Sequence, residues 1–192
     1  MSGLILASSS RYRAGLLQRL GLDFDQVSPD VDETPRAGES PEDLVRRLAA
    51  DKARAVAARH PGRVVIGSDQ IAVAGGEVLG KPGDRPRAVD QLTRLSGQTV
   101  TFLTGLCVVD AAGGEQLEQV PTQVVFRALT AGEIEDYVDR ERPFDCAGSF
   151  KSEALGIALF EAVRSDDPTA LIGLPLIALC GMLGRAGIRV LA

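Results

Sequence analysis

The sequence predicts a mixed α/β protein, because strand-like runs alternate with helix-like stretches early in the chain and form hairpins later. A strand at 4–7 precedes a helix at 11–20, and a β-branched strand at 64–66 follows a second helix. Two later strand-like runs flank Ala111-Ala-Gly-Gly114, a pattern typical of an antiparallel hairpin. The 192 residues contain no linker-like tract, so we expect one domain over residues 1–192.

The first part of the chain carries clear boundary signals. Leu4-Ile-Leu-Ala7 is an apolar strand, and the helix that follows Ser8-Ser-Ser10 is closed by a glycine at position 21. A further strand is expected over 24–28. Ser40-Pro-Glu-Asp43 combines an N-cap, a proline and first-turn acids, so a helix should begin there and run to about His60.

The strand at 64–66 is expected to end at Gly67-Ser68, which would place Asp69 at its carboxyl end. In open α/β sheets that edge binds ligands. Gly75-Gly76 joins two short runs in a predicted hairpin, whose register would bring Lys81 back near Asp69. The strands of this hairpin are expected at 71–74 and 77–79. The other expected elements are a helix at 86–95, a hairpin of 99–109 with 115–126, a helix from Thr130 to about Val138, a strand at 157–160, a helix from 173 to 183 and an edge strand at 188–191.

Composition excludes several classes of protein. The net charge of −5 argues against a nucleic-acid backbone as the partner. No apolar stretch approaches the ~20 residues of a membrane span, and the N-terminus lacks the features of a signal peptide. The three cysteines are far apart and His60 is the only histidine, so we expect a reduced cytoplasmic protein without a histidine-driven mechanism. The oligomeric state is left open, a homodimer included.

Ser8-Ser-Ser10 and the following helix start form a candidate anion site. A hydroxyl-rich loop before a helix offers free backbone N–H groups and the positive end of the helix dipole to a phosphate. Serines are also ordinary N-caps, which is the simpler interpretation. Arg11 and Arg13 at the same helix start favour the anion site.

Carboxylates and lysines elsewhere could complete such a site. Asp69 could be an ordinary turn residue, and the loop 29–35, with Asp30, Asp32 and Glu33, could be a solvated surface loop. As a cluster, however, these acids could supply oxygen ligands for Mg²⁺. Lys52 lies in the apolar stripe of its helix, where it either snorkels to water or meets carboxylates or a phosphate in a cleft. Lys81 is either a fixed ligand-binding residue or an exposed turn lysine.

Several motifs together resemble the Maf family of nucleotide pyrophosphatases, once described as septum-formation inhibitors. The resemblance covers nearly the whole chain, in order and with compatible spacing. The motifs are Leu4-Ile-Leu-Ala-Ser-Ser-Ser10, Val31-Asp-Glu-Thr-Pro35, Glu39-Ser-Pro41, Lys52-Ala53, Gly67-Ser-Asp-Gln70, Gly80-Lys-Pro82, Cys146-Ala-Gly-Ser-Phe-Lys-Ser-Glu153 and Gly173-Leu-Pro-Leu176.

The resemblance implies a mixed sheet with flanking helices, similar to the inosine triphosphate pyrophosphatase fold, with two lobes around a cleft. It implies a divalent metal cation, Mg²⁺ or Mn²⁺, and a small-molecule nucleotide substrate cleaved to a nucleoside monophosphate and pyrophosphate. Gly-Ser-Asp-Gln together with Phe-Lys-Ser-Glu resembles the branch that acts on 7-methyl-GTP, since the dTTP/UTP branch is expected to have Gly-Ala-Asp-Thr at the former place.

Position by position, the resemblance assigns roles to individual residues. Asp69 would be the catalytic carboxylate that accepts a proton, and Glu33 would assist the metal. Ser8, Arg13, Lys52 and Lys81 would hold the phosphates. Tyr12, Gln70 and Glu153 would correspond to the positions that set base preference. The family pattern usually has a proline followed by Arg or Trp where this chain has Arg11-Tyr12, a smaller stacking surface.

The residues and the resemblance agree on hydrolysis of an α–β phosphoanhydride. The resemblance implies that the substrate is 7-methyl-GTP and that the products are 7-methyl-GMP and pyrophosphate. Asp69 could serve as a metal ligand or take the proton of water directly. A positively charged methylated guanine would suit an aromatic face from Tyr12 and a carboxylate from Glu153. The alternatives are a dTTP/UTP or broader modified-nucleotide pyrophosphatase, a non-catalytic regulator of cell division, and a nucleotide-binding module without hydrolysis.

Overall fold

The computed structural model describes residues 3–191 and divides into two compact units. Each unit is assembled from segments that are distant in the sequence. The first unit comprises Met1–Gln70, Thr104–Val120 and Asp167–Ala192. The second unit comprises Ile71–Leu103 and Pro121–Asp166. The second unit is therefore inserted into the sequence of the first.

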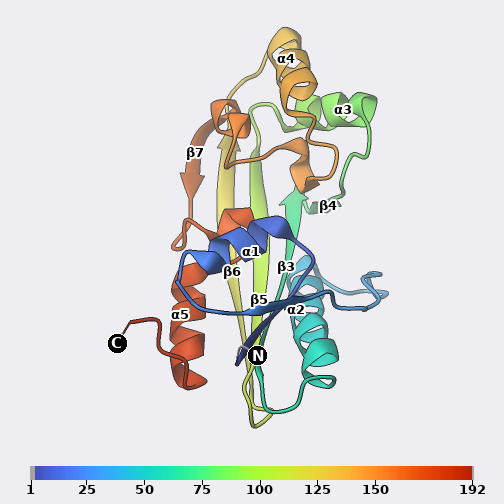
Figure 1. Cartoon of the computed structure of the whole chain (residues 1–192). Coiled ribbons are helices and arrows are strands. Elements are labelled where there is room, and N and C mark those ends of the chain that lie inside the picture. The colour runs from blue at the N-terminus through green and yellow to red at the C-terminus, as the bar shows by residue number, and fades with distance from the viewer. Residues whose placement is uncertain (1–2, 192) are drawn as a thin grey trace. The chain divides into compact units, whose positions relative to one another are not determined.

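Over residues 3–191, seven strands form a mixed sheet, which confirms the predicted fold class (Figure 1). The strand order is β2-β1-β3-β5-β6-β7, and β4 pairs with β3 off this path. The pairs β1–β2 and β1–β3 are parallel, whereas β3–β4 and β6–β7 are antiparallel. The strands are β1 (Leu4–Ala7), β2 (Asp25–Val27), β3 (Val64–Ala74), β4 (Glu77–Leu79), β5 (Thr99–Val109), β6 (Glu115–Phe126) and β7 (Phe160–Arg164).

The first unit has an apolar core on each face of its sheet, because side chains alternate along β1 and β3. Leu4, Leu6 and Ile66 belong to one cluster, together with side chains of α1 (Arg11–Gln18) and α5 (Leu176–Arg185). The other cluster contains Ile5, Ala7 and Val65, packed against α2 (Pro41–Ala57). One sheet face is thus covered by α1 and α5, and the other face is covered by α2.

The predicted starts of α1 and α2 are confirmed, whereas α5 begins at Leu176 and not at 173. The Ser40 side chain accepts from the backbone N–H of Asp43, with a proline at the next position, as the motif indicated. The Ser10 side chain accepts from the backbone N–H of Arg13 at the start of α1. Both helices end two or three residues before the predicted positions, which is the usual uncertainty at helix ends.

The second unit contains α3 (Arg85–Leu95) and α4 (Ala131–Glu141), together with β7. Its core includes a group of four phenylalanines whose rings meet edge to face at centroid distances of 4.8–5.5 Å. Thr130 and Glu133 form a reciprocal capping box at the start of α4. The turn of Gly75 and Gly76 has positive φ at both residues and joins β3 to β4, as predicted.

Three predicted boundaries are wrong. The strand that begins at Val64 does not end at Gly67-Ser68 but continues to Ala74, so Asp69 lies within β3. Residues 155–159 form a 3₁₀ turn in place of a strand, and the strand begins only at Phe160. No strand forms at 188–191, where Ile188 and Val190 pack against the first apolar cluster without pairing to the sheet. In each case an apolar run was taken as the whole signal for a strand.

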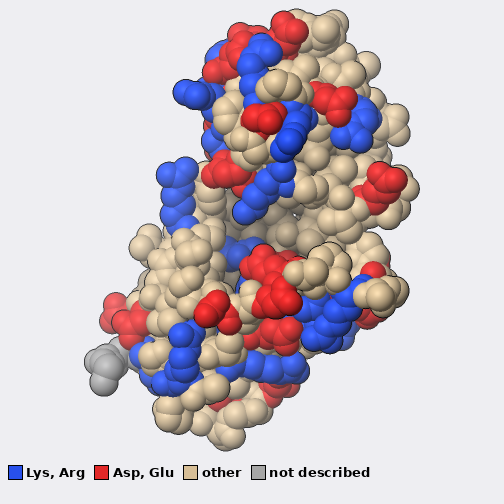
Figure 2. Space-filling model, turned by 90° about the vertical axis from the view of Figure 1, so that its right-hand side faces the viewer, with Lys and Arg blue, Asp and Glu red and all other residues tan. Residues whose placement is uncertain are grey.

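Within the described part of the chain, every helix is too short or too polar to cross a bilayer. Acidic and basic side chains are interspersed over the face shown in Figure 2, without a single basic field. This mixture agrees with the modest net charge of −5.

Candidate functional site

Lys52 is the centre of a charged group in the first unit. Its Nζ lies 2.6 Å from Oδ1 of Asp69 and 2.7 Å from Oε1 of Glu33. Lys52 and Asp69 are 6% and 7% exposed, whereas the Glu33 side chain is 60% exposed. The Lys52 ammonium therefore contacts two carboxylates. Of the two interpretations of the sequence, contact with carboxylates is the one that the structure shows, and snorkelling to water is not.

The contact between β3 and α2 explains why this group can form. Gly67 and Asp69 are two residues apart on β3, so both face α2. A Cβ atom at Gly67 would lie 2.3 Å from the carbonyl oxygen of Ala49 and 2.6 Å from the backbone nitrogen of Ala53. Only glycine allows the helix to approach the strand this closely, and the approach brings Lys52 within reach of Asp69.

Ser68 and Gln70 point to the opposite face of β3, where they contact the turn at residues 170–173. Ser68 Oγ lies 3.0 Å from the carbonyl oxygen of Gly173 and 2.8 Å from that of Gly105. Gln70 Nε2 donates to the carbonyl oxygens of Ala170, at 2.8 Å, and of the next residue along the chain, at 3.0 Å. These bonds let polar side chains stay buried in the middle of a strand, which is why β3 does not end there.

The same turn orients Arg13, the predicted phosphate-binding arginine. Its Nε donates to the carbonyl oxygen of Gly173 at 2.8 Å, and its Nη1 lies 3.4 Å from Oγ of Ser8. Burial lowers the pKa of the Arg13 guanidinium from its ordinary value, and the charges of Asp69 and Glu33 oppose this shift. The structure therefore brings Ser8 and Arg13 together and places Arg13 in the field of both carboxylates. A phosphate-binding role for the two residues stays a prediction.

Two of the three residues predicted to set base preference lie in the first unit, and both have partners within the chain. The Arg11 guanidinium lies 4.9 Å from the centroid of the Tyr12 ring, and its Nη2 donates to the Tyr12 hydroxyl at 2.9 Å. The Gln70 amide nitrogen also lies 3.0 Å from Oγ1 of Thr104. The amide nitrogen of Gln70 is thus used in holding the 170–173 turn.

Lys81 and Glu153 belong to the second unit, so the structure defines their own surroundings but not their distance from Asp69. The expected approach of Lys81 to Asp69 stays a prediction. Both side chains are exposed. Within its unit, Lys81 forms no hydrogen bond or ion pair with the described residues, and Glu153 contacts only Ser152 Oγ, at 3.4 Å.

The segments that carry Lys81 and Glu153 are fastened to each other. Gln91 of α3 donates from Nε2 to the carbonyl oxygen of Gly80 at 3.3 Å, and its Oε1 accepts from the Ser149 hydroxyl. The backbone N–H of Gly83 donates to the carbonyl oxygen of Phe144 at 3.0 Å. Ser149 is fully buried and has a positive φ of 60°, an uncommon conformation for a non-glycine residue.

Sequence reasoning missed Thr104, Gln91 and the carbonyl oxygens at 170–173. A backbone carbonyl has no sequence signature, so the turn could not be found from residue types. Gln91 and Thr104 are common residues without a local pattern, and their role depends on partners 34 to 66 residues away. No signal in the sequence identified them.

The charge balance of the first unit fits a divalent cation. Lys52 and Arg13 together only offset the two carboxylates of Asp69 and Glu33, so this group alone offers no net positive charge to a triphosphate. Mg²⁺ is usually bound by one or two carboxylates together with substrate phosphates and water. Among residues 3–191 no group of three acidic, histidine or cysteine side chains could hold a metal unaided. Asp69 and Glu33 therefore fit a divalent cation only if further ligands come from outside the described residues.

Comparison with solved structures defines the class of fold. The chain is similar to a HAM1 protein from Coxiella burnetii, with a TM-score of 0.51 and 14% identity, over 96% of this chain and 100% of that one. At this identity the likeness shows the fold alone, and it agrees with the mixed α/β architecture.

The family follows from sequence comparison. The model of the family described as Maf-like protein matches residues 3–186, and the chain belongs to this family, as the motifs predicted. It is 57% identical to a 7-methyl-GTP pyrophosphatase of Nitrosococcus oceani, over 98% of this chain and 95% of the relative. It is 54% identical to a 7-methyl-GTP pyrophosphatase of Pseudomonas aeruginosa, over 99% of this chain and 100% of the relative.

Proposed function

We propose that the chain hydrolyses the α–β phosphoanhydride of 7-methyl-GTP and releases 7-methyl-GMP and pyrophosphate. The structural observation that carries this proposal is the charged group in which buried Lys52 contacts both Asp69 and Glu33. The two relatives described above are named for this activity, and the match covers nearly the whole length of each. Family membership and the charged group thus support the same class of chemistry.

In the proposed reaction, a water oxygen attacks the α-phosphorus while the bond from this phosphorus to the bridging oxygen breaks. The electron pair of that bond leaves with pyrophosphate, and Asp69 accepts the proton of the water. Oδ1 of Asp69 accepts a hydrogen bond from Nζ of Lys52, and this bond fixes the direction of the carboxylate. Lys52 and Arg13 would stabilise charge on the phosphate oxygens.

Asp69 and Glu33 are the residues that would hold a divalent metal. Such a cation neutralises phosphate charge and lowers the pKa of bound water. Ser8, whose hydroxyl lies beside Arg13, would add a neutral donor to the phosphates. Lys81 would contribute a further cation from the second unit.

The base preference is the finer part of the proposal. It depends on the printed names of the relatives and on Tyr12, Gln70 and Glu153, which match the positions that set base preference in the family. N7-methylguanine is positively charged, so the Glu153 carboxylate would favour it over unmethylated GTP. A preference for dTTP or UTP would contradict this assignment and leave the hydrolysis itself in place.

A pyrophosphate-release assay tests both parts. The substrates are 7-methyl-GTP, GTP, dTTP and UTP, each with Mg²⁺, with Mn²⁺ and with EDTA. We expect 7-methyl-GTP to be preferred, release to require the metal, and Asp69→Asn to lower kcat by about 10²-fold to 10⁴-fold. Asp90→Asn, at an exposed carboxylate of α3, is the matched control and should match the wild type. Wild-type turnover in Asp69→Asn would contradict the catalytic role.

A further inference from the structure

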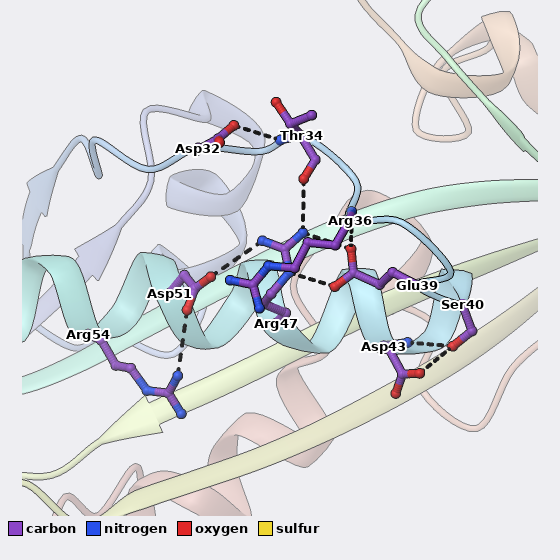
Figure 3. Close-up of polar contacts among 9 residues, drawn as sticks. All are labelled: Asp32, Thr34, Arg36, Glu39, Ser40, Asp43, Arg47, Asp51 and Arg54. Carbon is purple, nitrogen blue, oxygen red and sulfur yellow. Dashed lines mark hydrogen bonds and ion pairs between the residues drawn. The ribbon is translucent and has the colours of Figure 1, made fainter.

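A second charged group of the first unit surrounds Arg47 on α2 (Figure 3). Arg47 forms a bidentate contact with Glu39, in which Nε lies 2.6 Å from Oε1 and Nη2 lies 2.8 Å from Oε2. Nη2 also donates to the carbonyl oxygen of Thr34 at 3.1 Å, and Nη1 lies 3.5 Å from Oδ2 of Asp51. The side chains of Arg47 and Glu39 are only 12% and 8% exposed. Neither residue has a role in the reaction described above.

The contacts of Arg47 fasten the loop between β2 and α2. Glu39 Oε2 also accepts the backbone N–H of Arg36 at 3.0 Å, and Asp32 Oδ1 accepts the backbone N–H of Thr34 at 2.9 Å. Residues 28–39 contain no helix or strand, so no regular backbone ladder fixes their path. The position of this loop therefore depends on side-chain contacts, and Arg47 makes three of them.

Glu33 lies in this loop, immediately before Thr34. Its carboxylate contacts Lys52 at 2.7 Å, yet the side chain is 60% exposed. An ion pair with an exposed partner contributes little by itself and cannot be expected to fix a loop. The contact from Arg47 to the Thr34 carbonyl, at 3.1 Å, is one residue away, and it comes from a side chain that is 12% exposed and is also held by Glu39.

The protonation of Glu39 supports a strong contact. The hydrogen bonds from Arg47, followed by the backbone N–H of Arg36, lower the pKa of Glu39 to about 2. The pair therefore stays charged over the whole neutral range. Arg forms this two-pronged contact with a carboxylate, whereas Lys cannot.

We propose that Arg47 is a positioning residue, which fixes the 32–39 loop and thereby holds Glu33 against Lys52. The inference rests on the proposed function, because Glu33 matters to the reaction only if the Lys52 group performs it. Arg47 acts through Glu33 and touches neither substrate nor metal.

The first experiment compares Arg47→Met with Arg54→Met. Arg54 is a matched control, since it lies on the same helix and makes the same two-pronged contact, with Glu115, at 2.7 and 2.8 Å. We expect Arg47→Met to lower kcat/KM for the nucleotide by about 10-fold to 100-fold, as is typical when a residue that orients a ligand side chain is lost. Arg54→Met should leave kcat/KM unchanged. Glu39→Gln should reproduce the loss, and Arg47→Lys should recover only part of the activity.

A double-mutant cycle separates positioning from general support of the fold. If Arg47 acts through Glu33, then Arg47→Met should cause no further loss of kcat/KM in a Glu33→Ala background. If the two losses multiply, Arg47 does not act through Glu33 and the inference is overturned.

Hydrogen exchange of the nucleotide-free protein gives a readout that does not depend on turnover. Amides at 32–39 should exchange faster in Arg47→Met and Glu39→Gln than in the wild type, and should be unchanged in Arg54→Met. If the wild type releases no pyrophosphate, the proposed function fails, while faster exchange would still support the loop contact. If the wild type is active but exchange at 32–39 is unaffected by both variants, the inference fails and the proposed function stands.

Discussion

The two units differ in how they hold the residues predicted to form the site. In the first unit, Lys52 already contacts both Asp69 and Glu33, and Lys52 and Asp69 are buried. In the second unit, Lys81 and Glu153 are exposed, and what is fixed is the backbone that carries them. The charges of the first unit are already paired with one another, whereas in the second unit only the backbone is fixed by hydrogen bonds.

This difference separates two costs of binding a charged ligand. A paired and buried group needs no reorganisation when the reaction begins, which favours catalysis. An exposed lysine loses side-chain entropy when it binds but breaks no existing contact. We therefore expect substitution of the paired residues in the first unit to lower both the free energy of unfolding and the activity. Substitution of exposed Lys81 in the second unit should lower the activity alone.

The largest expected effect is loss of stability in Lys52→Met. This substitution leaves Asp69 buried without its cation, which typically costs about 3–5 kcal/mol of the free energy of unfolding. Urea unfolding at neutral pH measures the loss. The double variant Lys52→Met/Asp69→Leu should recover part of it, since the unpaired charge is then absent. A single variant as stable as the wild type would show that the pair is not buried in solution.

Lys81→Met should instead change activity without changing stability. Loss of one charge-assisted contact of about 1.5–3 kcal/mol corresponds to a fall in kcat/KM of about 10-fold to 150-fold. The free energy of unfolding should stay within about 0.5 kcal/mol of the wild type. Arg87→Met, at another exposed cation of the second unit, is the control and should be normal in both measurements. A destabilised Lys81→Met would erase the contrast between the units.

Ser149 tests whether the backbone of the second unit is held under strain. Ser149→Ala removes the hydroxyl that donates to buried Gln91, and an unsatisfied buried acceptor costs about 1–3 kcal/mol. Ser149→Gly loses the same bond but relieves the left-handed backbone conformation by about 1–2 kcal/mol. Urea unfolding should therefore rank the glycine variant above the alanine variant. The reverse order would show that the positive φ stores no strain.

The smallest expected effects concern one acid from each unit, Glu39 and Glu133. The pKa of Glu39 in the first unit is lowered to about 2 by Arg47 and the N–H of Arg36. The pKa of Glu133 in the second unit is lowered to about 2 by the N–H of Thr130 and by Arg127. A lowered folded-state pKa stabilises the fold above the unfolded value near 4.5, and this stabilisation is lost as pH falls toward about 2.

Glu39→Gln and Glu133→Gln should each be less stable than the wild type at pH 6, and each difference should shrink between pH of about 4.5 and about 2. Acid titration of unfolding checks this window. Only Glu39→Gln should also lower activity at neutral pH, because only Glu39 is linked to Glu33. Equal activity in the two variants would remove that distinction.

Much of the fold could be predicted because the signals were local. Ser40 with Pro41, the N-cap Thr130 and the Gly75-Gly76 turn are each local signals, and the structure confirms all three. Lys52 was also identified as a candidate, since a lysine in an apolar helix stripe either snorkels to water or meets a partner, and the structure shows the partner. These features require no knowledge of distant segments.

The errors arose where distant segments decide the outcome. Ser68 and Asp69 have the composition of a turn, yet β3 continues through them because carbonyl oxygens at 105 and 173 and the ammonium of Lys52 satisfy their side chains. Arg47 adjoins another arginine on a helix, which is typical of a solvated surface. Only the folded loop shows that its partners are Glu39 and the carbonyl oxygen of Thr34.

The carbonyl oxygen of Gly173 has a consequence for how the protein is made. Arg13, which it orients, is 160 residues earlier in the chain, and Ser68 is 105 residues earlier. During synthesis both side chains leave the ribosome long before their acceptor exists. We expect the first unit to remain incomplete until its last segment, residues 167–192, has left the ribosome. If translation stalls before that point, the second unit could therefore fold before the first.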